Sequence, residues 1–111
     1  MAERGTESGP AEKAKRRAAR ELIAAYHQEQ LRTLLEHVRN GFARFDSAEI
    51  DEFQLDDLIH RYKRAASDLW KFCGSGGSQW LQAANTLTYL RERGEEPDWW
   101  EQSAPPTNRS G

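Results

Sequence analysis

The sequence predicts an all-α fold, a three-helix bundle made of a long antiparallel helical hairpin and a shorter third helix. Good helix formers without proline fill residues 12–44, and apolar residues recur at helical spacing in three segments. Short loops join these segments, which favours antiparallel neighbours. The helical domain is expected to cover residues 12–101. Residues 1–11 and 102–111 are poor in large apolar side chains and are predicted to be disordered tails.

The first helix is predicted from about Glu12 to Arg44. Gly41 follows Asn40 and could end it as a C-cap, but the apolar spacing continues in phase through Phe42 and Phe45. We therefore expect the helix to continue beyond Gly41. Its predicted buried stripe consists of Leu22, Ile23, Tyr26, Leu31, Leu34, Leu35, Val38, Phe42 and Phe45.

The second helix is predicted to begin after an N-cap at Asp46 or Ser47, with Asp46 and Glu49 forming a capping box. A kink or a short first turn near residues 53–55 is compatible with the pattern. Gly74 is expected to stop this helix. The predicted buried stripe consists of Leu55, Leu58, Ile59, Tyr62, Ala66, Leu69, Trp70 and Cys73.

The third helix is expected to start at an N-cap on Ser78, after a glycine-rich turn, and to end near Arg93 at Gly94. Pro97 prevents further helix directly after it. We interpret the turn at 74–78 as a connection rather than a phosphate-binding loop, because no strand precedes it.

Composition indicates a cytoplasmic protein that binds no membrane. The longest apolar stretch, Leu22–Tyr26, is far too short to span a bilayer, and a secretory signal is not expected, since no positively charged start precedes an apolar run. Cys73 is the single cysteine, so the chain forms no internal disulfide and no cysteine-based zinc site.

The sequence predicts no catalytic residue, no metal site and no cofactor. His60 has Asp56 and Asp57 at helical spacing before it, which a salt bridge explains, while His27 and His37 have no such carboxylate. Cys73 lies on an apolar stripe near a helix C-terminus, where a buried, unreactive thiol is expected.

A compact basic run in the first helix makes nucleic-acid binding the second hypothesis. A helix–turn–helix order in the later part of the chain adds to it, with polar residue types on the third helix that read base edges. The pI near 5.9 argues against it. The same run is also explained as a solvated helix extension, or as a partner for the acidic block 46–57 of a neighbouring chain. The candidate nucleic-acid-binding residues are Lys13, Lys15, Arg16, Arg17 and Arg20.

The tryptophans suggest a binding surface. Trp70 and Trp80 lie on helical stripes and are expected to pack in the core. Trp99 and Trp100 follow Pro97 in an acidic segment outside the three helices, where two exposed indoles would be costly. They either fold back to cap the bundle, which we favour, or dock into a partner, which makes them the candidate partner-binding residues.

Three phrases carry a resemblance: HRYKRAA at 60–66, LWKFC at 69–73 and EPDWW at 96–100. In them the chain resembles a family of short, uncharacterised actinobacterial helical proteins over roughly residues 21–101. That family has no assigned activity, so the resemblance implies no functional residue.

The leading hypothesis is a non-enzymatic helical interaction module that self-associates as a homodimer or binds a protein partner. Nucleic-acid association through residues 13–20 is the alternative, and a metal-dependent enzyme is a more distant one.

Overall fold

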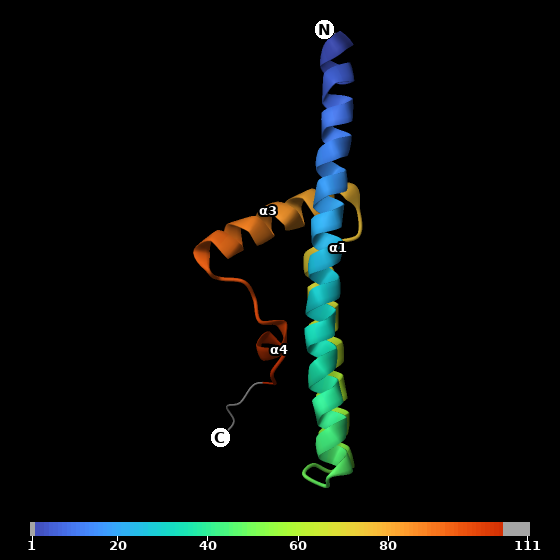
Figure 1. The fold of residues 1–111 in the computed structure, drawn as a ribbon, viewed down its shortest axis with the longest axis vertical. Helices are drawn as coiled ribbons and strands as arrows, with labels where there is room; N and C mark the ends of the chain where they lie inside the picture. Colours follow the sequence, from blue (N-terminus) through green and yellow to red (C-terminus); the bar gives the residue numbers. More distant parts are fainter. Residues whose placement is uncertain (1, 106–111) are drawn as a thin grey trace. The chain divides into compact units, whose positions relative to one another are not determined.

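The computed structural model describes the backbone of residues 2–105 and the side chains of residues 9–105, and it confirms the all-α fold. It contains a long helix α1 (Ala2–Asp46), α2 (Glu52–Cys73), α3 (Gly77–Arg93) and a short α4 (Trp99–Gln102) (Figure 1). Within the described residues there is no strand. Helix α1 packs against α2 and α3, as the predicted hairpin with a third helix requires.

Contacts divide the chain into two compact units that share α1 and α2. The hairpin unit consists of Gln28–Lys71 with the described residues from Pro97 onward. The α3 unit consists of the described residues up to His27 with Phe72–Glu96. Each unit has its own buried residues and is treated separately below.

The helix bounds in the structure differ from the predicted tails at both ends of the chain. Helix α1 begins at Ala2, so it includes residues 2–11, for which composition predicts a tail. Pro10 lies inside this part of α1 and supplies no backbone N–H to the helix. At the other end α4 extends to Gln102, and residues 106–111 of the predicted tail lie outside the described part. Disorder of the tails stays a prediction.

The hairpin unit is an antiparallel pair formed by the second half of α1 and most of α2 (Figure 1). Its buried positions on the two helices are Leu34, Gly41, Leu55, Ala65 and Leu69. At Gly41 the helices approach closely, because a Cβ atom there would lie 2.8 Å from Cδ1 of Leu58. Gly41 is therefore a packing residue within α1, and the prediction that the helix continues past it is confirmed.

The predicted start of α2 is wrong by about one turn. Asp51 is its N-cap: Oδ1 of Asp51 accepts a hydrogen bond from the Gln54 amide, and Oε1 of Gln54 accepts one from the Asp51 amide, each at 2.9 Å. This reciprocal pair is a capping box. Asp46 instead ends α1, and the Ser47 hydroxyl donates to the Arg44 carbonyl at 3.2 Å. Ala48, with φ at 65°, reverses the chain between the helices.

The α3 unit is formed where α3 crosses α1 at a steep angle (Figure 1). The buried residues from α1 are Ala19, Ile23 and Tyr26, and those from the rest of the unit are Cys73, Ala83, Ala84 and Leu87. The ring centroids of Tyr26 and Phe72 lie 5.9 Å apart.

The ends of α3 correct one prediction and confirm another. Gly76, not Ser78, is the N-cap and it has no side chain, so Oε1 of Gln79 reaches back to accept from the Ser75 amide at 2.7 Å. Gly94 ends α3 with φ at 67°, and Gly74 follows α2 with φ at 77°, a left-handed conformation that glycine adopts without strain.

The close approach at Gly41 gives a test of the hairpin packing. We expect Gly41→Leu to lower the free energy of unfolding by about 2–3 kcal/mol, because the new side chain must displace Leu58. Urea denaturation followed by circular dichroism measures this loss. The matched control is Ala43→Leu at an exposed position of the same helix. Equal stability of the two variants would contradict the packing role of Gly41.

Candidate interaction surfaces

One flank of the hairpin unit is covered by α4. Pro97 interrupts helical structure, and Asp98 then caps the short helix by accepting a hydrogen bond from the Glu101 amide at 3.1 Å. The two tryptophans that follow Asp98 are buried, Trp99 with 7% and Trp100 with 8% of its surface exposed. This is the fold-capping arrangement, so in this structure the pair is part of the packing rather than an open docking segment.

Trp100 packs on side chains from both helices of the hairpin. The ring of His37, on α1, stacks parallel to the indole with the centroids 4.3 Å apart. The guanidinium of Arg61, on α2, lies over the same indole, with its carbon 4.3 Å from the ring centroid. Such stacked and cation–π contacts stabilise by about 1 kcal/mol each beyond area burial. The indole thus joins α1, α2 and α4.

Two arginines of α2 bind the backbone at the end of α4. Nη2 of Arg61 donates to the Trp100 carbonyl at 2.8 Å, and Nη2 of Arg64 donates to the Ser103 carbonyl at 3.1 Å. Nε of Arg61 also lies 3.3 Å from Oγ of Ser103, a buried hydroxyl that donates to the Trp100 carbonyl at 2.7 Å. Carbonyls at a helix C-terminus carry partial negative charge, so cations are stabilised there.

A groove of about 870 Å³ lies beside this contact, within the hairpin unit. Its charged lining consists of three arginines and one aspartate, Arg44, Arg61, Arg64 and Asp57. Its remaining lining is mostly polar or aromatic and includes His37, Asn40, Gln54, His60 and Trp100. The sequence did not identify these arginines as candidates, because Arg44 is an ordinary basic residue in the last turn of α1 and the spacing of Arg61 and Arg64 on α2 matches a solvated face. The contacts of Arg61 and Arg64 with the end of α4 join residues 39 positions apart in the chain.

The opposite flank of the hairpin is apolar and open. Leu35, Phe42, Ala66 and Trp70 each directly follow a buried residue of the hairpin core, namely Leu34, Gly41, Ala65 and Leu69. One residue is a 100° step around a helix, and in an antiparallel pair that step leads to the same side of both helices. His37 and Arg61 each lie one turn before a buried residue, on the side where α4 packs. We call Leu35, Phe42, Ala66 and Trp70 the apolar face.

The apolar face corrects the predicted core. Leu35, Phe42 and Trp70 were expected to be buried, yet they are 49%, 46% and 58% exposed, and Leu22 in the α3 unit is 36% exposed. The apolar stripe of α1 is wider than the surface that its neighbours cover. The three large side chains together leave on the order of 300 Å² of apolar surface in water. Apolar patches of this size on small proteins often mark interaction sites.

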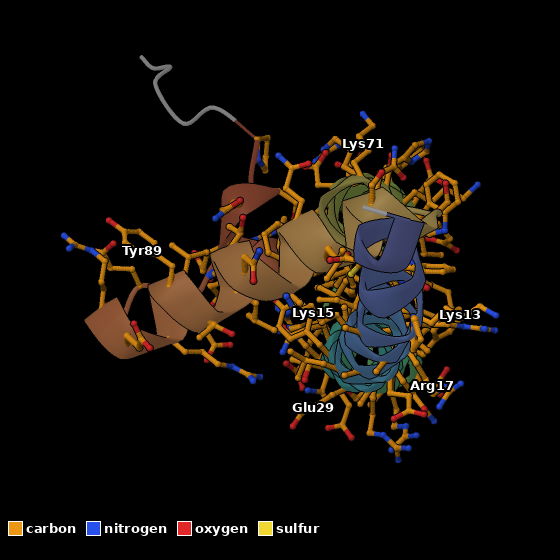
Figure 2. All side chains as sticks on the ribbon, turned by 90° about the horizontal axis from the view of Figure 1, so that it is seen from above. Lys13, Lys15, Arg17, Glu29, Lys71 and Tyr89 are labelled. Carbon is orange, nitrogen blue, oxygen red and sulfur yellow. The ribbon has the colours of Figure 1, made fainter. Side chains whose placement is uncertain are left out.

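The basic run of α1 does not form one stripe. Figure 2 shows Lys13 and Arg17 pointing to the side of α1 away from α3, and Lys15 pointing to the other side. Within the α3 unit, Cδ of Arg16 would lie 3.0 Å from a Cβ atom on Gly77, and the Arg20 guanidinium lies 5.5 Å from the centroid of the half-buried Trp80 ring. Packing on α3 therefore accounts for two of the five residues.

The titratable candidates form no metal cluster among the described residues. Nδ1 of His60 hydrogen-bonds the Asp56 carbonyl at 2.9 Å and lies 3.5 Å from Oδ2 of the same residue, the pair expected from their spacing. Burial lowers the pKa of His27. Cys73 is 1% exposed, and burial raises the pKa of its thiol to about 11. At neutral pH this thiol is protonated.

No helix in the described part of the chain is long and apolar enough to cross a membrane. No protein-family model, no curated protein and no solved structure gives a significant match to this chain.

The packing of Trp100 can be tested by truncation. We expect Trp100→Ala to lower the free energy of unfolding by about 3–5 kcal/mol, because the indole contacts both helices of the hairpin. Phe53→Ala is the control, since Phe53 belongs to the same unit but is 81% exposed. Calorimetric melting of both variants gives the comparison. A loss no greater for Trp100→Ala than for Phe53→Ala would refute the capping role.

The burial of the Cys73 thiol makes the free energy of unfolding depend on pH. This thiol has a pKa of about 11 in the folded protein, against 9.0 without burial, so the unfolded chain loses the proton first as the pH rises. Its stabilising contribution is full below pH 9 and is lost between pH 9 and about 11, up to about 3 kcal/mol. Urea titrations across this range should show a steeper decline for the natural protein than for Cys73→Ala. Parallel declines would show that the burial of the thiol has no such effect.

Proposed function

We propose that this protein is a non-enzymatic helical interaction module that forms a homodimer through the apolar face of its hairpin unit. The supporting observation is that Leu35, Phe42 and Trp70 are half-exposed on a single flank. The opposite flank of the hairpin is covered by α4, whereas no described residue covers the apolar face in the same way. A second copy of the chain covers this flank in the proposed dimer.

The spacing of the apolar residues suits helix-on-helix packing. On α1, Leu31, Leu35, Val38 and Phe42 follow one another at intervals of four, three and four residues, the seam of a two-helix contact. On α2, Ile59 and Trp70 lie beside Ala66 on the same side. Two such hairpins, related by a two-fold axis, present large side chains to each other and complete a four-helix arrangement.

The charge distribution favours one orientation of the two copies. The segment from the end of α1 to the first turns of α2 is strongly acidic, with Asp46, Glu49, Asp51, Glu52, Asp56 and Asp57. If both turns lay at the same end of a dimer, these acids would repel one another. With the turns at opposite ends, the acidic segments are kept apart, and each faces an end of the partner where Arg32 and Lys71 offset Glu29 and Asp68. We therefore place the two hairpins antiparallel.

The other functional hypotheses have less support. Two of the candidate nucleic-acid-binding residues, Arg16 and Arg20, pack on α3; of the other three, Lys13 and Arg17 point to one side of α1 and Lys15 to the other. An enzyme would need a reactive group, and the buried Cys73 thiol is protonated at neutral pH. We propose the cytoplasm as the location of the dimer.

Sedimentation velocity over micromolar concentrations tests the dimer. The natural protein should sediment as a dimer, and Trp70→Glu and Phe42→Glu should each weaken association by at least tenfold, because a carboxylate would be buried in the contact. Phe53→Glu is the matched control: the same change at an 81% exposed aromatic residue of α2 outside the apolar face. It should leave the dimer intact.

Two results would overturn the proposal. A monomer at every concentration would remove the dimer, and equal weakening by Phe53→Glu would show that added negative charge, not the apolar face, controls association. A dimer whose acidic turns lie side by side, measured by distances between spin labels attached at position 47 in a Cys73→Ala background, would contradict the antiparallel arrangement.

A further inference from the structure

The groove on the α4 flank has a different chemistry from the apolar face. We infer that it is a binding site for a small anionic molecule that carries phosphate or carboxylate groups. The groove belongs wholly to the hairpin unit and lies on the flank opposite to the proposed dimer contact, so this inference does not depend on the dimer.

The charge of the lining selects an anion. Arg44, Arg61 and Arg64 line the groove together with a single carboxylate, that of Asp57. Side chains with amide donors, Asn40 and Gln54, add neutral hydrogen-bonding groups to the same surface. Guanidinium groups match phosphate and carboxylate oxygens in pairs of parallel hydrogen bonds, so an excess of arginine in a concave site favours such ligands over neutral ones.

Two of the arginines are held in position before any ligand arrives. Arg61 is fixed by the Trp100 indole and the Trp100 carbonyl, and Arg64 by the Ser103 carbonyl. The contact described for Arg64 uses one nitrogen of its guanidinium, which has five N–H groups in all, so the other N–H groups can bind a ligand. Because these side chains are already ordered, binding costs less side-chain entropy than it would on a free surface.

Two of the neighbouring acids pair with arginines of the groove, and they reduce the positive charge of those arginines only weakly. Oε1 of Glu49 lies 3.5 Å from Nε of Arg44, and Oε2 of Glu101 lies 3.9 Å from Nη2 of Arg61. Both carboxylates are well exposed, and exposed ion pairs contribute little. A ligand with two or more negative charges can displace them, since it gains several charge-assisted hydrogen bonds at once.

The size of the groove sets the scale of the ligand. At about 870 Å³ and open to solvent, it is large enough for a small organic molecule and much larger than a single phosphate ion. The indole of Trp100 is already covered by His37 and Arg61, so we do not assign it a stacking role toward the ligand. In this inference the groove recognises the ligand through the anionic groups of the ligand.

Calorimetric titration of the full chain with pyrophosphate and, separately, with citrate tests the inference at constant ionic strength. Saturable binding with a dissociation constant below about 1 mM is expected for at least one probe. Binding of pyrophosphate alone identifies a phosphate ligand, binding of citrate alone a carboxylate ligand, and both outcomes support the site.

Charge-matched variants locate the binding. Arg64→Gln and Arg44→Gln should each weaken it by about tenfold or more, and Arg44→Gln alters an exposed side chain, which keeps the test valid if Arg64→Gln does not fold. Arg39→Gln, at an exposed position of α1 outside the groove, removes the same charge and should have no effect. Absence of saturable binding up to about 10 mM, or equal weakening by Arg39→Gln, would overturn the inference.

Discussion

Two packed helices bury only the side chains that lie between them, and each flank of the pair needs a further element to cover it. Among the described residues, the hairpin unit meets this requirement on one flank only. On one flank α4 supplies the buried Trp100, held by His37 and Arg61. On the other flank Leu35, Phe42 and Trp70 stay half-exposed. The candidate surfaces of the protein follow from this difference.

The two flanks also differ in the chemistry they can recognise. The flank covered by α4 orders arginine side chains on backbone carbonyls and leaves a concave surface with excess positive charge. The apolar face has no comparable polar network and suits a broad contact between helices. Because these properties lie on opposite sides of one hairpin, the proposed association of two chains and the proposed binding of a small anion would use different residues.

Local signals allowed much of the fold to be predicted. The phase of the apolar residues showed that α1 continues past Gly41, and Gly74 and Gly94 were correctly placed at helix ends. The capping residue of α2 was missed because Asp46 and Asp51 both have a Glu or Gln three residues later. Choosing between them requires knowing where the chain reverses, and Ala48 gives no sequence signal for its positive φ.

The candidate surfaces were harder to predict, because they depend on contacts between distant residues. Trp70 has the spacing of a core residue, yet its side chain is 58% exposed, which the spacing alone does not indicate. Arg61 binds a carbonyl 39 positions later in the chain, and the periodicity of the sequence does not predict a contact over that separation. The cost of exposing two indoles predicted the burial of Trp99 and Trp100, but it did not predict which side chains pack on them.

The single thiol has a consequence for how motions of the molecule can be followed. Cys73 is buried at the end of α2 in the α3 unit, and the hairpin unit contains no cysteine. A thiol reagent can modify this residue only when its surroundings open, so the modification rate measures the free energy of that opening. Comparison with the rate expected for complete unfolding would distinguish local fraying at the end of α2 from loss of the whole fold.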